Sequence, residues 1–210
     1  MARGENLAVG NDVVDLTDPW IARHHEDADF VARVCSDEER RRVNTKRDLW
    51  RLFAAKEAAY KALVKLGRAP GFAHRALLVS ADGGSVAWSD CRLALSVTDD
   101  LDHVHAVAWS EGHRPRARVA RADGAEAVAD EGTRARDLLR DLVASTFGYL
   151  AGDLEVIRDP APGTWDGRGP PRIVRRAVPL DIAVSLSHDG PFVAAATLVG
   201  LLDRTVAPHA

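Results

Sequence analysis

The feature that most constrains the fold is an internal repeat. Sliding the 210-residue sequence against itself by 89 positions places KRDLWRLFAAKE, from Lys46, on ARDLLRDLVAST, from Ala135. At the same offset, LALSVTDDLDHVHAVAW, from Leu93, falls on IAVSLSHDGPFVAAATL, from Ile182. These gapless matches contain five identities in twelve positions and five in seventeen. A composition rich in Ala, Arg and Leu can produce one such match, but two at one offset indicate a duplication.

Each repeat is predicted to contain one long helix followed by an antiparallel hairpin. The helices are expected over about 46–66 and 133–149, and alternating apolar residues after each helix predict paired strands. The predicted fold class is therefore α+β, a pseudo-dimer of two helix-plus-antiparallel-sheet halves. A polar, Gly/Ala-rich stretch separates the halves. The expected segments are a first half over 1–112, a linker over 113–132 and a second half over 133–210.

The polar residues of the two repeats have diverged in a complementary way. The first repeat carries Lys56 and Glu57 where the second has a Ser-Thr pair. The second carries Ser187 and His188 where the first has a Thr-Asp pair. Had both repeats kept a complete site, these residues would match. The sequence therefore predicts one composite site between the halves.

Two charged side chains fall on the predicted core face of the first helix. At about 100° per residue, the apolar stripe includes Lys56 and Glu57, and Lys61 lies at its edge. A buried charge is costly unless it is paired, hydrogen-bonded or bound to a metal. An ordinary surface pair between Glu57 and Lys61, four residues apart, would explain those two residues. It leaves Lys56 unexplained, so the pattern favours a functional role.

Asp12 follows Gly10 and Asn11 at the end of an apolar strand, with Asp15 three residues on. A simple turn is one interpretation. Together with Glu57, however, Asp12 offers the oxygen ligands that Mg²⁺ prefers, with water and a substrate phosphate completing the shell. The lysines would then face phosphate oxygens.

A second polar group lies near the C-terminal end of the sequence. Ser185, Ser187 and His188 end a strand before a turn, and hydroxyls with an imidazole suit an anionic phosphate ligand. A Ser/His hydrolase is the other interpretation. It is disfavoured because the sequence contains no Gly-x-Ser-x-Gly motif and no triad order.

Composition argues against several classes of function. A formal net charge of -3 does not favour nucleic acid as the main partner. No run approaches the roughly 18 apolar residues of a membrane span, and no signal-peptide pattern opens the sequence. Two cysteines, Cys35 and Cys91, suggest reduced thiols. We expect a cytoplasmic protein that binds neither nucleic acid nor membrane.

Four segments together resemble the 4′-phosphopantetheinyl transferases: GNDVVDL, RVCSDEER, FAAKEAAYKAL and SLSHD. The family's strongest signatures are G-x-D near a strand end and a helix with the pattern aromatic-x-x-K-E-(A/S)-x-x-K, matched here at 10–12 and 53–61. The motif order is similar to that of the small holo-acyl-carrier-protein synthases. The length and duplication resemble the larger pseudo-dimeric type that serves surfactin-like synthetases. In that type the S-x-S-H half comes first, so the halves here look circularly permuted.

This resemblance implies the 4′-phosphopantetheinyl transferase fold and Mg²⁺-dependent transfer of 4′-phosphopantetheine from coenzyme A to a serine of an acyl or peptidyl carrier protein. The product 3′,5′-ADP would be released, in fatty acid, polyketide or nonribosomal peptide biosynthesis. Because the two halves would complete one site internally, we expect a monomer. The implied metal ligands are Asp12, Glu57 and Asp15; the coenzyme A-binding residues Lys56, Lys61, Ser187, His188 and Arg136; and the catalytic groups Glu57 and Lys61.

The sequence departs from the larger type at two places. Val14 stands where that type has a third carboxylate, with Asp15 one residue later. The turn before the S-x-S-H segment reads Gly-Pro-Pro-Arg instead of Gly-Lys-Pro, and Arg168 or Arg172 would supply the missing charge.

Two alternative functions belong to other classes. One is a non-catalytic module that binds coenzyme A or a carrier protein, against which the presence of both Asp12 and Glu57 argues. The other is a Mg²⁺-dependent phosphohydrolase, which the absence of further acidic clusters around these carboxylates in the sequence disfavours.

Overall fold

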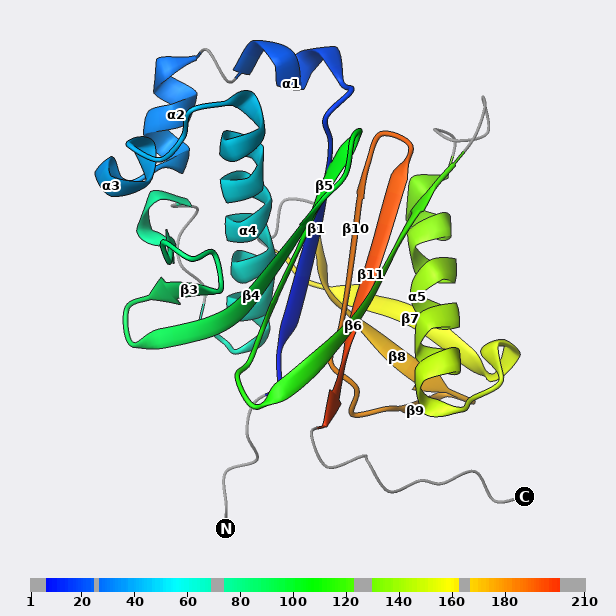
Figure 1. The fold of residues 1–210 in the computed structure, drawn as a ribbon. Helices are drawn as coiled ribbons and strands as arrows, with labels where there is room; N and C mark the ends of the chain where they lie inside the picture. The colour runs from blue at the N-terminus through cyan, green and yellow to red at the C-terminus, as the bar shows by residue number, and fades with distance from the viewer. Residues whose placement is uncertain (1–6, 25–26, 69–73, 123–129, 163–166, 201–210) are drawn as a thin grey trace, which may run out of the picture.

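The structure, a computed structural model, describes residues 7–24, 27–68, 74–122, 130–162 and 167–200. Two long helices, α4 (Lys46–Lys65) and α5 (Glu131–Phe147), lie on opposite sides of the central strands (Figure 1). The shorter helices are α1 (Pro19–His24), α2 (Ala28–Val34), α3 (Asp37–Arg40) and the 3₁₀ turns η1 (His74–Ala76) and η3 (Ala151–Asp153). Within the described ranges, no helix is both long and apolar enough to cross a membrane.

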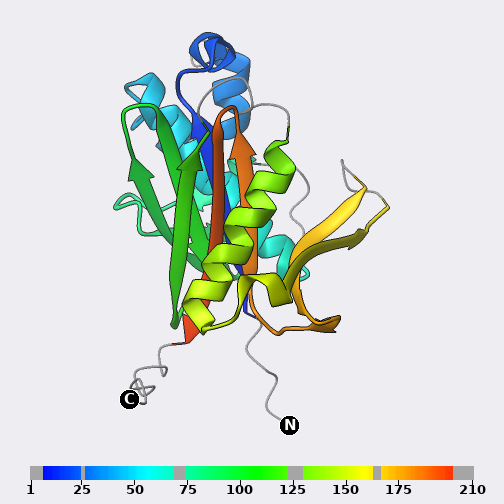
Figure 2. The same ribbon diagram turned by 90° about the vertical axis from the view of Figure 1, so that its right-hand side faces the viewer.

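The strands form three antiparallel sheets. The first has the order β1 (Val9–Asp15), β5 (His103–Trp109), β4 (Cys91–Asp99), β3 (Ser85–Trp88) and β2 (Leu78–Val79). The second has the order β10 (Val184–Asp189), β11 (Phe192–Gly200) and β6 (His113–Arg121). The third contains β7 (Leu154–Pro160), β8 (Arg168–Arg175) and β9 (Val178–Pro179). Figure 2 shows α5 lying across β10 and β11, with β7 and β8 projecting beside it.

The structure shows the duplication and adds a strand to each repeat. In both repeats a strand precedes the long helix, and the hairpin after the helix places its second strand in the centre: β1-β5-β4 and β6-β11-β10. The hairpin registers agree, because Thr98 pairs with His105, and Ser187 pairs with Ala194, each 89 residues later. Asp12 pairs with Ala106 and Arg118 with the equivalent Ala195, so Asp12 and Arg118 occupy equivalent positions. The fold is an α+β pseudo-dimer, as the sequence predicts.

The predicted linker over 113–132 is wrong for its first nine residues, because they form β6. The strand escaped detection because its sequence, HRPRARVAR, alternates arginine with small residues and proline instead of large apolar side chains. Residues 123–129 of the predicted linker lie outside the described residues. The division into halves remains a prediction.

Helix α4 packs closely on β1. It begins at a capping box in which Thr45 and Asp48 exchange hydrogen bonds, and it ends before Gly67, which has a φ of 70°. A Cβ atom at Gly10 would lie 1.9 Å from the carbonyl oxygen of Ala58, so only glycine lets the helix backbone approach the strand here. The buried face of α4 is rich in alanine: Ala54, Ala55, Ala58, Ala59 and Ala62.

The two halves meet where β1 and β10 run side by side in the same direction. Backbone N–H groups of β1 donate to side chains of β10: Asn11 to Ser185 Oγ at 3.0 Å and Val13 to Ser187 Oγ at 3.4 Å. Further along, the Asp15 N–H donates to Asp189 Oδ2 at 2.7 Å. Side-chain oxygens of β10 thus take the place of a backbone ladder for these three N–H groups of β1.

Lysines of α4 complete this seam. Lys65 Nζ donates to the carbonyl oxygens of Val9 (2.5 Å) and Val184 (2.6 Å), one from each half. Burial, followed by the charge of Lys61, lowers the pKa of Lys65 from its ordinary 10.5 to about 7. The seam therefore contains a buried amine that titrates near neutral pH.

Replacing Lys65 by methionine should remove part of the pH dependence of stability. Between about pH 7 and 10.5 the unfolded chain keeps this proton while the folded protein releases it, so the wild-type free energy of unfolding rises with pH in this window. Below pH 7 both states hold the proton and the contribution is constant. The slope from this one group is at most about 1.4 kcal/mol per pH unit. Urea unfolding at pH 7 and pH 9 measures it, and equal pH dependence in both proteins would contradict the assignment.

Candidate functional site

A cavity of about 230 Å³ opens at the end of the seam, between β1, the first half of α4 and the β10–β11 turn. Its polar lining is mostly acidic: Asp12, Asp18, Glu57 and Asp189, together with His188. Apolar side chains form the rest of the lining: Val13, Val14, Trp20, Ile21, Trp50 and Phe53. Four carboxylates around so small a space favour a cation or an anion that brings a cation with it.

Asp12 links the two halves at the floor of this cavity. Its Oδ1 accepts hydrogen bonds from Lys61 Nζ at 2.7 Å and from Ser187 Oγ at 2.9 Å. Burial raises the pKa of Asp12, the charge of Lys61 opposes this shift, and the charge of Glu57 adds to it. Asp12 and Glu57 are therefore close enough to repel each other, although 45 residues separate them in the sequence.

Glu57 has a partner that sequence reasoning missed. His74 Nε2 lies 2.5 Å from Glu57 Oε1, and the His74 ring stacks on Phe53 with centroids 5.2 Å apart. The imidazole holds the Glu57 carboxylate from the side of η1. Only a contact between distant segments identifies His74, because no spacing in the sequence relates it to Glu57.

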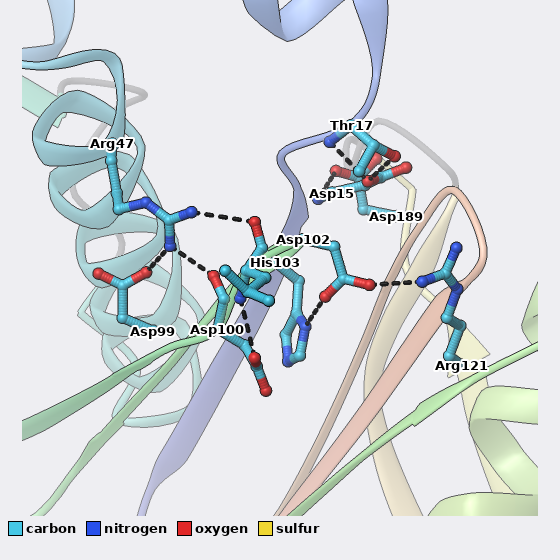
Figure 3. Close-up of polar contacts among 10 residues, drawn as sticks. Asp15, Thr17, Arg47, Asp99, Asp100, Asp102, His103, Arg121 and Asp189 are labelled. Atoms are coloured by element: carbon cyan, nitrogen blue, oxygen red, sulfur yellow. Dashed lines mark hydrogen bonds and ion pairs between the residues drawn. The ribbon is translucent and has the colours of Figure 1, made fainter.

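Asp15, predicted as a metal ligand, faces away from the cavity. Strand alternation puts it on the opposite face of β1 from Asp12. Its Oδ1 accepts hydrogen bonds from the backbone N–H (2.9 Å) and hydroxyl (2.6 Å) of Thr17. Figure 3 shows Asp15 turned toward Thr17 and Asp189. Its position fits the simple turn and does not support the predicted metal role.

Lys56, predicted to bind the coenzyme A pyrophosphate, is fully buried elsewhere. Its Nζ contacts Glu39 Oε2 at 2.6 Å and the Val34 carbonyl oxygen at 2.7 Å, and its side chain is 0% exposed. Glu39, at the N-terminus of α3, also accepts hydrogen bonds from the backbone N–H groups of Ser36 and Val79. Burial lowers the pKa of Lys56 and Glu39 opposes this shift. The lysine on the core face is half of a buried ion pair and does not reach the cavity.

Ser187 and His188 point to opposite faces of β10. Ser187, predicted to contact the nucleotide, is buried in the seam, where its hydroxyl bonds to Asp12 and Lys61. His188 lines the cavity, is 43% exposed, and lies 2.7 Å from Glu131 Oε2 at the start of α5. Glu131 is a second residue that the sequence analysis missed.

Asp189, also missed, follows His188 at the cavity rim. Burial, together with the charges of Asp12, Asp15 and Asp18, raises its pKa to about 6. The backbone hydrogen bond from Asp15 opposes this shift. Its position shows that negative charge accumulates at this end of the seam.

The arginines singled out from the sequence lie outside the cavity. Arg136 Nη2 donates to Thr133 Oγ1 at 2.9 Å within the first turns of α5. Arg172 pairs with Asp159 at 2.8 Å on the third sheet, and Arg168 begins β8. None of the three is among the described residues that line the cavity.

The donor set fits Mg²⁺ with a limited number of protein ligands. Among the described residues, no three His, Cys, Asp or Glu side chains cluster as a metal site. Asp12 and Glu57 each have one oxygen engaged by the protein, Oδ1 and Oε1, and both line the cavity. Mg²⁺ is commonly held by one or two carboxylates, water and substrate phosphate, so these two residues meet its requirement.

Comparison with known proteins gives a match to one family. The model of the 4′-phosphopantetheinyl transferase superfamily matches residues 8–114, a range that contains Asp12, Glu57 and Lys61. Among solved structures, the holo-[acyl-carrier-protein] synthase of Neisseria meningitidis is similar, with 24% identity and a TM-score of 0.40. That match covers 50% of this chain and 97% of the synthase. No curated protein sequence matches the chain.

Proposed function

Because the chain belongs to the 4′-phosphopantetheinyl transferase superfamily, we propose that it transfers 4′-phosphopantetheine from coenzyme A to a serine of an acyl or peptidyl carrier protein. The observation that carries this proposal is the convergence of Asp12 and Glu57 on one cavity. Each belongs to one of the two motifs that characterise the family. The coenzyme A pyrophosphate would enter a space lined with carboxylates only together with a cation.

We propose Asp12 and Glu57 as the residues that hold Mg²⁺. When bound, Mg²⁺ would supply positive charge that neutralises the pyrophosphate. Lys61, 30% exposed beside Asp12, is proposed to face the phosphate that leaves and to stabilise its charge. Ser187 and the Asn11 carbonyl oxygen hold the Lys61 ammonium group in place.

The reaction needs no nucleophile from this chain. The carrier serine oxygen forms a bond to the β-phosphorus, the bond from that phosphorus to the bridging oxygen breaks, and 3′,5′-ADP leaves. The serine proton goes to Glu57, directly or through water. His74 orients the Glu57 carboxylate for this role. His188, on the exposed rim, is proposed to contact the nucleotide 3′-phosphate.

The composite arrangement supports one site per chain and a monomer. Asp12 and Lys61 come from the first repeat and Ser187 from the second, and all three join in one hydrogen-bonded group. In the second repeat, Arg118 and Thr146 stand at the positions of Asp12 and Glu57. A second pair of metal-binding carboxylates is therefore missing from the equivalent place.

Incubation with coenzyme A, Mg²⁺ and an apo carrier protein tests the proposal by mass spectrometry. Transfer adds the mass of the phosphopantetheine arm to the carrier. Coenzyme A breakdown without that gain would indicate a phosphohydrolase. If neither change occurs, the chain acts as a binding module.

Dephospho-coenzyme A, which lacks the 3′-phosphate, adds a second substrate to the assay. His188→Ala should raise KM for coenzyme A about tenfold or more and leave dephospho-coenzyme A almost unaffected, since the lost hydrogen bond is to a charged group. An equal rise in KM for both substrates would show that His188 does not contact the 3′-phosphate.

A further inference from the structure

A second hollow lies in the second repeat, away from the candidate site. It is a groove of about 630 Å³ between β6 and the last turns of α5. Three arginines from alternate positions of β6 line one side: Arg114, Arg116 and Arg118. The facing helix contributes Leu142, Ser145, Thr146 and Phe147.

The repeat explains why a groove exists here. The sheet registers place Arg116 at the position that Gly10 occupies in the first repeat, since Gly10 pairs with Ala108 and Arg116 pairs with Thr197, 89 residues later. Gly10 lets α4 approach β1 closely. Arg116 at the equivalent position carries a Cβ atom and an exposed side chain that lines the groove, so α5 cannot approach β6 as closely as α4 approaches β1.

The same comparison shows a reversal of charge. Asp12 of the first repeat corresponds to Arg118, and Glu57 corresponds to Thr146. Arg118 Nη2 donates to Ser145 Oγ at 3.0 Å. Among the described residues, no carboxylate pairs with Arg114, Arg116 or Arg118. The second repeat therefore has a cationic groove with two hydroxyl groups where the first repeat has the proposed cation site.

We propose that this groove binds an organic polyphosphate. Alternate residues of a strand are about 6.8 Å apart, so the backbone positions of the three arginines span about 14 Å, and this row suits a chain of phosphates better than a single one. Guanidinium groups bind phosphate oxygens through paired hydrogen bonds, and the Thr146 hydroxyl offers an additional donor. The apolar wall formed by Leu142 and Phe147 suits an organic part of the ligand. This site is independent of the proposed transfer reaction.

Titration calorimetry with tripolyphosphate as the probe tests the proposal. The buffer contains EDTA and little salt, because the acidic cavity repels a polyanion when Mg²⁺ is absent. We expect one tripolyphosphate per chain, with affinity that falls as salt is added. Arg116→Gln and Arg118→Gln should each weaken binding roughly tenfold, by loss of charge-assisted hydrogen bonds.

Arg92→Gln is the matched control, because Arg92 is an exposed arginine of β4 in the other repeat and should leave the affinity unchanged. Transfer activity of Arg116→Gln should equal that of wild type, which separates this site from the proposed function. Absence of binding at about 10 mM tripolyphosphate, or unchanged affinity in both groove variants, would overturn the proposal. So would a groove-dependent interaction with an acidic protein without any affinity for tripolyphosphate.

Discussion

Replacing Glu57 by glutamine should lower kcat/KM for transfer roughly 100- to 1,000-fold, while the free energy of unfolding changes by no more than about 1 kcal/mol. Glutamine keeps the size of the side chain and an oxygen that can accept from His74. It loses the negative charge that the proposed metal site requires. Asp12→Asn should behave in the same way, because its amide oxygen can still accept from Lys61 and Ser187.

Steady-state assays at several Mg²⁺ concentrations, together with urea unfolding, measure both effects. Asp15→Asn is the matched control on the same strand, and it should keep most of the activity because Asp15 faces Thr17. Wild-type turnover and unchanged Mg²⁺ dependence in Glu57→Gln would refute the assignment of Glu57. A loss in Asp15→Asn as large as that in Glu57→Gln would restore Asp15 as a ligand.

Lys56→Met should destabilise the protein by about 3–5 kcal/mol without changing coenzyme A binding by the folded protein. The substitution leaves the Glu39 carboxylate buried without its ion-pair partner, which is the costly situation for a buried pair. For a chain of this size, the melting temperature should fall by roughly 10 °C. Thermal unfolding measures the loss, and KM for coenzyme A should stay within about threefold of wild type.

The double variant Lys56→Met/Glu39→Gln separates a structural role from a binding role. A neutral amide at position 39 can still accept from the backbone N–H groups of Ser36 and Val79, so much of the lost stability should return. If Lys56→Met instead kept its stability and showed a tenfold higher KM for coenzyme A, the predicted pyrophosphate role of Lys56 would stand.

Residue periodicity predicts the local structure well. The helix expected over 46–66 is confirmed as α4. The burial of Lys56 on the core face is confirmed too. These features depend on residues within a few turns of one another, so the order of residue types contains enough information to predict them.

The partners of those residues depend on tertiary structure. The helical pattern placed Lys56 in the core but could not show that Glu39 would lie there with it. The Ser-x-Ser-His motif suggested a phosphate site, whereas the strand places Ser187 in the seam and only His188 at the cavity. Whether a side chain of β10 lies in the seam or at the cavity depends on the strand that runs beside β10. That strand is β1, about 170 residues earlier in the chain.

The sequence alone determined the duplication, the long helices and the family, because these are recorded in residue spacing and identity. Only the tertiary structure decided which residues share a site. It placed Lys56 and Asp15 outside the cavity and added Asp189 to its lining. It also identified His74 and Glu131 as partners of Glu57 and His188, and β6 as the first strand of the second repeat. The physical reason is that buried charges and strand edges must find partners, and in this chain those partners come from segments far apart in sequence.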